Sequence, residues 1–283
     1  MKCMPILRFI SLLLILTSVS PGTAGGESRK IFNLCCVVYP SDAAIPWDCH
    51  RMKRGETPEK LFGDHWLDVL RFNRIDRRHL TTGVSIKVPR NLEEITDFSP
   101  LPDSYPEAAK EEKFILVNLA EQFLGAYEHG ELLFSFPIAS GDRKDQTPTG
   151  DFRVTAFSRR HESSLYKIEK TKIPYPMHYG LRFFINRRGV EFWLHGRDLP
   201  GFPASHGCVG LYDEEMQQKY YKFPQQPQLL DARTLYEWVV ESEEDSGAFT
   251  PLKYGPRVRI IGEQPLLGRV ESRFHPVLPH QLR

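Results

Sequence analysis

The sequence predicts a mainly β fold with a few helices, in which a small α/β module precedes one large β-sandwich or barrel-like domain. Two observations indicate this class. Between residues 114 and 261, short apolar or alternating segments recur with turn signals between them, as in sandwiches and barrels. Between residues 47 and 91, strand, helix, helix and strand patterns follow one another closely. The length of 283 residues accommodates one large and one small domain.

The first residues have the pattern of a secretory signal peptide. Lys2 and Arg8 flank the start of an apolar run over residues 6–19, and small residues follow it. We therefore expect cleavage near Ala24 or Gly25, with a signal peptide over residues 1–24 removed and the protein exported to the periplasm or cell envelope. An uncleaved anchor is the alternative, although the run is short for a membrane span. No second apolar run of that length follows, so the mature form is expected to have no transmembrane segment.

Export changes how the cysteines are interpreted. Cys35, Cys36 and Cys49 cluster near the mature N-terminus, and an oxidising compartment favours one disulfide between Cys49 and either Cys35 or Cys36. The spacing does not decide between these two partners. Cys208 stands alone far downstream and is predicted to be an unpaired, reactive thiol. A net charge of +1 and the lack of a dense basic patch argue against a nucleic-acid partner.

The small module is expected over residues 45–92. Thr57 is a predicted N-cap with Pro58 in the first helical turn, and apolar residues at helical spacing continue to Asn73. A short alternating strand then ends at Pro89. The matching residues resemble a LysM module: Gly55, Glu56, Thr57, Asn73, Gly83, Ile86 and Pro89. The resemblance implies binding to glycan that contains N-acetylglucosamine, and the alternative is a structural cap on the large domain.

A linker is expected over residues 93–112, because three prolines stiffen it and its end is polar. The large domain is expected over residues 113–262, followed by a tail over residues 263–283. Two helices are predicted late in this domain, over residues 213–221 and 231–240. The predicted strands cover residues 114–119, 123–127, 132–139, 152–157, 181–185, 191–194 and 258–261.

The chemistry is predicted to lie between residues 192 and 209. His195, Ser205, His206 and Cys208 occur there among glycines, and a core strand has little use for glycine or for so many polar groups. A cysteine nucleophile needs a base nearby, because a free thiol with a pKa of about 8.5 is mostly protonated at neutral pH. The alternative is zinc, bound by the two histidines and the cysteine with Asp198 as a further ligand.

His195-Gly196 followed by Ser205-His206-Gly207-Cys208 resembles the signature of the YkuD-type L,D-transpeptidases. Two earlier stretches, at residues 140–141 and 147–152, resemble the family's second motif and precede the first in the expected order. The resemblance covers residues 114–261 and implies a YkuD-type β-sandwich or barrel-like catalytic domain.

The resemblance also implies the roles of the residues. Cys208 would attack a stem tetrapeptide, release D-Ala and form a thioester, while His195 takes and returns the proton. The Gly196 carbonyl would orient His195, and the N–H groups of Gly207 and Cys208 would hold the oxyanion. Ser205 and His206 would support the site, no metal or organic cofactor would be needed, and carbapenems would acylate the cysteine.

Substrate contacts are expected from His178, Tyr179, Arg182 and Arg197. The implied partners are peptidoglycan stem peptides and glycan, with an envelope lipoprotein as a candidate acceptor, because periplasmic enzymes that attach such a lipoprotein share this architecture. Gly210 departs from the family, which usually has Arg or Asn there, so a group that holds the stem peptide is missing. Arg182 or Arg197 could replace it. The loop from His195 to Cys208 is also shorter than usual, which would open the cleft.

Two other functions stay open on sequence grounds. If water replaces the amine acceptor, the reaction becomes L,D-carboxypeptidase trimming of stem peptides. A non-catalytic wall-binding protein that keeps an inactive transpeptidase fold is the second alternative, although the retention of Cys208, His195 and His206 together argues against it.

Overall fold

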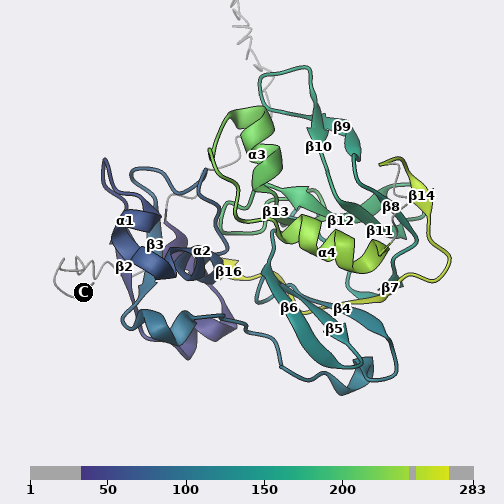
Figure 1. Ribbon diagram of the computed structural model, residues 1–283, viewed down its shortest axis with the longest axis horizontal. Coiled ribbons are helices and arrows are strands. Elements are labelled where there is room, and N and C mark those ends of the chain that lie inside the picture. Colours follow the sequence, from purple (N-terminus) through teal and green to yellow (C-terminus); the bar gives the residue numbers. More distant parts are fainter. Residues whose placement is uncertain (1–32, 242–246, 268–283) are drawn as a thin grey trace, which may run out of the picture. The chain divides into compact units, whose positions relative to one another are not determined.

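A computed structural model describes residues 33–241 and 247–267 of the chain (Figure 1). The predicted signal peptide over residues 1–24 lies outside the described residues, as does most of the predicted tail. Within the described ranges, no helix combines the length and the apolar character needed to cross a membrane.

Two five-stranded sheets form the large domain and confirm the predicted mainly β class. The first has the order β6-β5-β4-β15-β7 and the second the order β13-β12-β11-β8-β14. β15 runs parallel to β4, and β12 runs parallel to β13. The strands of the first sheet are β4 (Lys113–Asn118), β5 (Phe123–Glu128), β6 (Glu131–Pro137), β7 (Gly150–Arg153) and β15 (Arg257–Ile261). Those of the second are β8 (Ala156–Ser158), β11 (Gly180–Ile185), β12 (Glu191–Arg197), β13 (Val209–Tyr212) and β14 (Thr250–Pro251).

The predicted single strand over residues 152–157 is wrong. The structure divides it into β7, which pairs with β15, and β8, which pairs with β11 and β14. Val154 and Thr155 lie between the two strands, and their N–H groups bond to Pro256 and Arg182, one toward each sheet. The segment therefore crosses from one sheet to the other, although its alternating pattern continues without a break.

One apolar cluster fills the space between these sheets. Fully buried residues of β4, β5, β11, β12, β13 and β15 contribute to it, among them Ile115, Leu124 and Leu194. α4 (Asp231–Val240) joins the same cluster through Leu235 and Tyr236, as its predicted apolar face requires. α3 (Glu214–Tyr221) begins after Asp213, whose side chain accepts a hydrogen bond from the N–H of Met216 as an N-cap.

The N-terminal module has the predicted order of strand, helix, helix and strand. These elements are β2 (Trp47–Arg51), α1 (Pro58–Phe62), α2 (Trp66–Asn73) and β3 (Ser85–Pro89), and β2 pairs antiparallel with β3. Thr57 caps α1 as expected, because its hydroxyl accepts from the N–H of Lys60. The disulfide forms between Cys35 and Cys49, and Cys36 is a free thiol. The element order agrees with a LysM-like module, whose identity stays a prediction.

A second apolar cluster joins this module to the large domain. It contains Val69, Phe72 and Ile75 from the module together with Leu199 and Tyr212 from the region around the predicted site. The Tyr212 hydroxyl also donates to the carbonyls of Leu70 and Ile75, at 3.2 and 2.9 Å. The module and the large domain therefore share buried surface.

The segment predicted as a linker also packs. A third cluster combines Leu101 and Ala108 with Phe114 and Tyr127 of the first sheet. Other short elements complete the described chain: η1 (Leu34–Cys36), β1 (Val37–Val38), η2 (Pro40–Ala43), η3 (Gly63–His65), η4 (Leu92–Ile95), η5 (Pro106–Ala108), β9 (Glu162–Lys167), β10 (Pro174–Pro176) and β16 (Leu266–Leu267). β9 pairs with β10, and β16, the first part of the predicted tail, pairs with β1.

Candidate active site

Cys208 lies in a pocket of about 590 Å³ beside the second sheet. The hairpin of β9 and β10 forms one side of this pocket, and β12 with the loop that precedes β13 forms the other. The lining residues are His161, Glu162, Ser163, Ser164, Leu165, Tyr166, Lys167, Tyr175, Met177, Gly189, Val190, Glu191, Trp193, His195, Arg197, Ser205, His206 and Cys208. The structure therefore brings together six residues that the sequence predicted at the site or in contact with substrate: His195, Arg197, Ser205, His206, Cys208 and the intervening Gly207.

The parallel pairing of β12 with β13 explains why these residues meet. Leu194 lies opposite Val209 and His195 opposite Gly210, so Cys208 comes directly before β13 and beside the histidine strand. Residues 198–208 connect the two strands and form the loop that carries Ser205 and His206. This crossover places the thiol and the imidazole on one wall of the pocket, although twelve residues separate them in the chain.

The turn before Cys208 is held by hydrogen bonds of Ser205. Its hydroxyl accepts from the N–H of Gly207 at 3.1 Å and donates to the carbonyl of Cys208. Gly207 has φ +109°, and a Cβ there would lie 2.6 Å from the ring of Phe192, so this position requires glycine. Because the Gly207 N–H is engaged with Ser205, the Cys208 N–H is the better candidate for the predicted oxyanion contact in this conformation.

Residues of the second motif, at 140–141 and 147–152, form hydrogen bonds with the turn before Cys208. Thr147 accepts from the N–H of Gly141 at 2.8 Å and donates to the carbonyl of Gly207 at 2.9 Å. Gly141 also forms a parallel bridge with Ser205, and the N–H of Asp142 donates to the carbonyl of Ser205 at 2.8 Å. The two motifs thus act on one structural unit, which accounts for their common order in the chain.

The hydrogen bond of His195 determines its tautomer. Nδ1 lies 2.8 Å from the carbonyl oxygen of Gly196, which can only accept, so Nδ1 carries the proton and Nε2 has a free lone pair. Burial lowers the pKa of His195 to about 3, and the hydrogen bond to Gly196 opposes this shift only in part. The imidazole is therefore neutral at physiological pH.

Cys208 is a partly exposed thiol with a raised pKa. Burial raises the pKa of Cys208 to about 11, and a hydrogen bond with the backbone of Trp193 and the charge of Arg197 oppose this shift. The resting pair is thus a neutral thiol beside a neutral imidazole. A thiol with this pKa is protonated at rest, so its use as a nucleophile would require a base that takes its proton.

Arg197 fills the space that Gly210 leaves open. A Cβ on Gly210 would lie 1.8 and 2.0 Å from the Cδ and Cγ atoms of Arg197. The Arg197 guanidinium reaches from there to the carbonyls of Asp198 and Ala204, at 3.0 and 3.3 Å, and lines the pocket. Of the two arginines expected to replace the missing family side chain, Arg197 is the one in the pocket.

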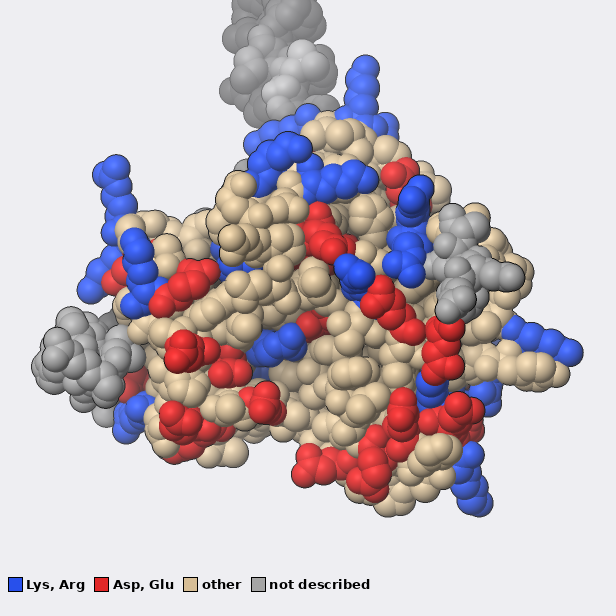
Figure 2. All heavy atoms as spheres, viewed as in Figure 1, with Lys and Arg blue, Asp and Glu red and all other residues tan. Residues whose placement is uncertain are grey.

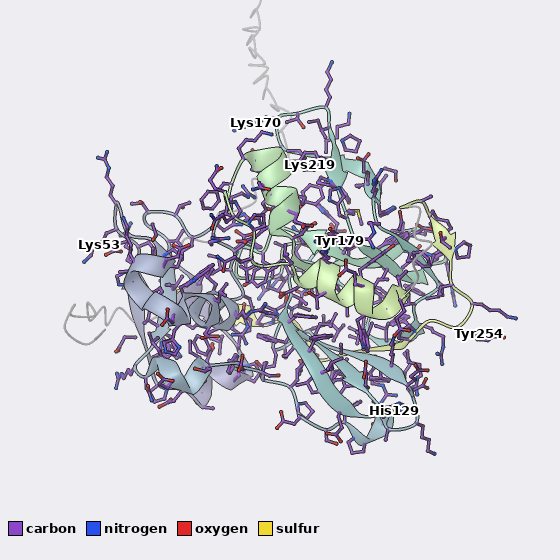
Figure 3. All side chains as sticks on the ribbon, viewed as in Figure 1. Lys53, His129, Lys170, Tyr179, Lys219 and Tyr254 are labelled. Carbon is purple, nitrogen blue, oxygen red and sulfur yellow. A yellow bond between two sulfur atoms is a disulfide. The ribbon has the colours of Figure 1, made fainter. Side chains whose placement is uncertain are left out.

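The other predicted substrate contacts lie outside this pocket. The Tyr179 hydroxyl donates to Glu215 of α3 at 2.5 Å, and its ring packs against Tyr236 of α4 (Figure 3). His178 lies 3.8 Å from Asp213, also on the side of the helices. Arg182 pairs with Glu191 at 2.7 Å and covers the ring of Phe249. His178 and Tyr179 lie in the turn between β10 and β11 and Arg182 lies on β11, and their residue types gave no indication of which way their side chains point.

The β9–β10 hairpin contributes pocket residues that were not predicted from sequence. The Tyr166 ring stacks on His206 with centroids 4.0 Å apart, and His161 stacks on Trp193 at 4.1 Å. Burial lowers the pKa of His161, which favours its neutral form. Most residues of β9 are polar and exposed, and its apolar Leu165 is exposed as well, so no periodic pattern marked this strand. The concentration of histidine and tyrosine between the two motifs was the available signal.

The zinc alternative is not assembled by this geometry. Among residues 33–241 and 247–267, only Asp76, His79 and Asp198 bring three ligand atoms within 4.8 Å of one another. His206 instead stacks on Tyr166, and Asp198 pairs with Arg78 at 2.9 Å. The predicted ligands His195, His206 and Cys208 therefore do not converge on one point.

Comparison with known proteins agrees with the geometry. Residues 112–244 match the family model of YkuD, the L,D-transpeptidase catalytic domain. Among curated proteins, none is detectably similar in sequence to this chain. Similar solved structures include an L,D-transpeptidase from Xylanimonas cellulosilytica, at 19% identity and TM-score 0.42, with 75% of this chain and 98% of that chain covered.

Two further structures are similar over shorter parts. The L,D-transpeptidase from Stackebrandtia nassauensis has 19% identity and TM-score 0.38, with 73% of this chain and 75% of that chain covered. L,D-transpeptidase 1 from Mycobacterium tuberculosis has 15% identity and TM-score 0.34 over 53% of this chain, which spans 62% of that chain's length. The stretch that matches the YkuD family model, residues 112–244, contains His195, Cys208 and both motifs.

Proposed function

We propose that this protein is a peptidoglycan L,D-transpeptidase that uses Cys208 as its nucleophile. One observation carries the proposal. A partly exposed thiol directly before β13 and an imidazole on β12 with a free Nε2 lone pair line the same pocket. That combination is suited to covalent acyl transfer, because a base next to the thiol can take its proton as the sulfur attacks.

In the first half-reaction, the sulfur of Cys208 attacks the carbonyl at the L-centre of the diamino acid in a stem tetrapeptide. The thiol proton moves to Nε2 of His195, and the N–H of Cys208 holds the oxyanion of the tetrahedral intermediate. His195 then gives the proton to the amine of the terminal D-Ala, which leaves. A thioester on Cys208 and a neutral His195 remain.

In the second half-reaction, an amine attacks the thioester. His195 takes a proton from the attacking amine and returns it to the sulfur as the bond to Cys208 breaks. The amine can belong to another stem peptide, which gives a cross-link, or to an envelope lipoprotein, which gives protein attachment. If water attacks instead, the product is a tripeptide and the reaction is L,D-carboxypeptidase trimming.

The pocket has charges of both signs, which suits a peptide that carries carboxylates and an ammonium group. Lys167 and Arg197 supply the cations, and Glu162 and Glu191 supply the anions. Lysines and arginines also gather over the β9–β10 hairpin and α3, at the top of the view in Figure 2. These groups support recognition of an acidic stem peptide, with Arg197 in the position that Gly210 vacates.

The decisive experiment is mass spectrometry of the purified protein with a disaccharide-tetrapeptide, with and without an amine acceptor. We expect a thioester adduct on Cys208, loss of D-Ala and a cross-linked product when acceptor is present. Cys208→Ala should abolish adduct and product while the circular dichroism spectrum is unchanged. Unchanged turnover in that variant would refute the enzymatic proposal. Only tripeptide at saturating acceptor would replace transpeptidation by trimming, and no adduct at all would favour the wall-binding alternative.

We also propose export to the periplasm or cell envelope and glycan binding by the N-terminal module over residues 45–92. The signal-like N-terminus and the LysM-like element order support these two assignments. Glycan binding is tested by co-sedimentation of the full chain with insoluble peptidoglycan, in competition with soluble N-acetylglucosamine oligomers. Sedimentation that the oligomers do not reduce would favour the structural-cap alternative.

A further inference from the structure

The chain between α2 and β3 contacts the loop that follows His195. The N–H of Asp76 donates to the carbonyl of Leu199 at 2.9 Å, and the N–H of Leu199 donates to Oδ2 of Asp76 at 2.7 Å. Ile75 forms an antiparallel bridge with Pro200. Residues 75–76 lie before the 112–244 family match, and they bind the strand-to-strand loop that carries the candidate active site.

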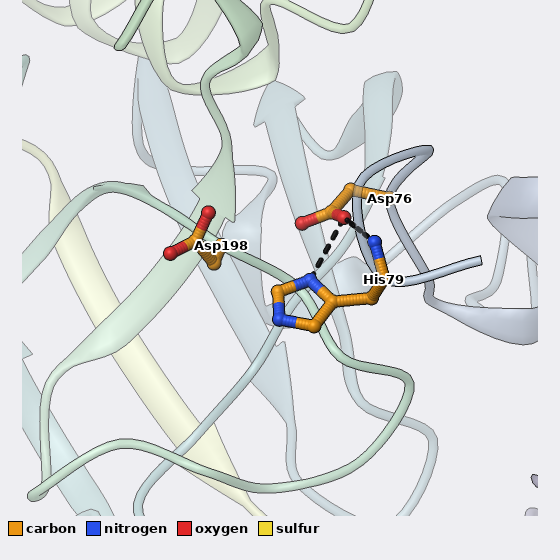
Figure 4. Close-up of side chains that lie close together, drawn as sticks. All are labelled: Asp76, His79 and Asp198. Atoms are coloured by element: carbon orange, nitrogen blue, oxygen red, sulfur yellow. Dashed lines mark hydrogen bonds and ion pairs between the residues drawn. The ribbon is translucent and has the colours of Figure 1, made fainter. Parts of the chain in front are cut away.

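Side chains reinforce this junction. Arg78 binds Asp198 through both ends of its guanidinium, with Nε 3.1 Å from Oδ1 and Nη2 2.9 Å from Oδ2. The Gln217 amide of α3 bridges the two acids, 2.7 Å from Oδ2 of Asp76 and 3.0 Å from Oδ1 of Asp198. Figure 4 shows Asp76 and His79 on the α2–β3 connection facing Asp198. Asp76 is completely buried and Asp198 is 7% exposed, so these contacts exclude most solvent.

Asp198 connects this junction to the pocket wall. The Tyr175 hydroxyl donates to Oδ2 of Asp198 at 3.2 Å, and the N–H of Asp198 lies 3.3 Å from the same hydroxyl oxygen. The carbonyl of Asp198 accepts from Nε of Arg197 at 3.0 Å. Tyr175 and Arg197 both line the Cys208 pocket. A single residue thus holds two pocket side chains and is itself held by Arg78 from the N-terminal module.

The same cluster has the composition of a cation site, since Asp76, His79 and Asp198 each offer a ligand atom within 4.8 Å of the others. Its hydrogen bonds argue for a different role, because each of the four carboxylate oxygens accepts at least two hydrogen bonds from fixed donors. A metal would have to displace these donors and would lie beside the Arg78 cation. The donors are the groups of Arg78, His79, Tyr175, Leu199, Gln217 and Tyr221.

We propose that Asp76 and Arg78 are positioning residues of the Cys208 site, which hold Tyr175 and Arg197 at the pocket wall through Asp198. The N-terminal module would then complete the active site in addition to any glycan that it binds. This inference rests on the proposed use of Cys208 as a nucleophile. A largely buried ion pair adds little net stability, so a role in fixing geometry is the one tested here.

The test compares Arg78→Ala with Arg77→Ala, a matched control in the neighbouring residue. Arg77 also binds the large domain, through the fully buried Glu214 at the start of α3, with Nε 2.7 Å from Oε1. Glu214 does not line the Cys208 pocket. Both substitutions therefore remove an arginine that joins the module to the large domain, and only Arg78→Ala cuts the connection to the pocket wall.

We expect Arg78→Ala to lower kcat/KM for the donor peptide by about tenfold or more, because misplacement of the wall disturbs substrate orientation. Arg77→Ala should lower it by less than about threefold at temperatures where both variants are folded. Tyr175→Phe should lower kcat/KM little further when it is added to Arg78→Ala. When it is added to Arg77→Ala, it should lower kcat/KM as much as it does in the wild type. The reason is that Arg78 and Tyr175 both act through Asp198, whereas Arg77 does not. Equal losses in both arginine variants, or additive effects of Tyr175→Phe in both, would overturn the proposal.

A second readout does not depend on the proposed reaction. Burial holds the pKa of Cys208 high, so a loosened wall should raise the rate of alkylation by iodoacetamide at pH 9 by at least about threefold. Peptide mass spectrometry would follow Cys208 alone, because Cys36 is also a free thiol. If the protein does not turn over donor peptide, a rise in Arg78→Ala with no change in Arg77→Ala still supports the positioning role. No difference between the two variants would refute it.

Discussion

Arg197 and Gly210 occupy complementary space on neighbouring strands. Arg197 lies over Gly210 so closely that a Cβ on the glycine would be 1.8 Å from its Cδ atom. Gly210 pairs with Ala139 through hydrogen bonds of 2.9 and 3.0 Å, and these bonds would have to break if the Gly210 backbone moved away from Arg197. The missing side chain after the nucleophile is thus matched by a guanidinium that reaches in from β12.

This relationship predicts the outcome of exchanging the two positions. Gly210→Arg alone should reduce Cys208 acylation by about tenfold or more, because it expels Arg197 from the pocket. Gly210→Arg combined with Arg197→Gly should recover most of the activity, since it restores one guanidinium to the same space. The measurement is kcat/KM for donor peptide in all four combinations. If kcat/KM of the double variant were as low as that of the less active single variant, the two positions would not be interchangeable.

The pH dependence of acylation follows from the two pKa values at the site. His195, with a pKa of about 3, is neutral above that pH, and the thiol of Cys208, with a pKa of about 11, stays protonated below it. The reactive neutral pair therefore persists across the range between them. We expect the rate of carbapenem adduct formation on Cys208 to change by less than about threefold from pH 5 to pH 9. A bell-shaped profile centred near neutrality would instead indicate a resting thiolate–imidazolium pair.

Thr147 should be needed for the geometry of the nucleophile turn. Thr147→Val keeps the shape but leaves the N–H of Gly141 and the carbonyl of Gly207 without their buried partner. We expect a loss of about 1–3 kcal/mol in the free energy of unfolding and slower acylation of Cys208. Thr155→Val is the control, because Thr155 is exposed and lies away from the pocket. Similar urea midpoints for both variants would contradict the buttressing role.

The shared apolar cluster predicts that the large domain is not stable alone. A chain that begins at Lys113 would expose Leu199 and Tyr212, among other buried residues that now pack against the module. Each large side chain that loses its burial costs about 1.5–3 kcal/mol, and several such losses approach the total stability of a typical domain. We expect a melting temperature lower by at least about 10 °C and binding of a hydrophobic dye.

The matched control for this truncation begins at Asn33 and keeps the module. It should melt like the full chain. A fragment from Lys113 that melts normally and still forms the carbapenem adduct would show that the large domain folds without the module, and would contradict the packing argument.

Local sequence determined the elements and the identity of the reactive groups. Alternating apolar residues predicted most strands of both sheets, and the N-caps of α1 and α3 follow from Thr57 and Asp213. His195, Ser205 and Cys208 could be recognised because their chemistry depends on residue type and on short spacings within one loop. The same holds for the presence of a disulfide, since cysteine clustering near an exported N-terminus predicts one.

Tertiary structure decided which of these groups meet. The division of residues 152–157 between two sheets, and the choice of Cys35 over Cys36, depend on strand pairing that no local pattern encodes. Tyr179 and Arg197 look equally suited to bind substrate, but Tyr179 lies in the turn before β11 and points to Glu215, whereas Arg197 on β12 lines the pocket. The contact of Arg78 with Asp198 joins residues 120 positions apart. Such contacts form only when the sheets close around their core, because sequence spacing constrains neighbours along the chain and not across it.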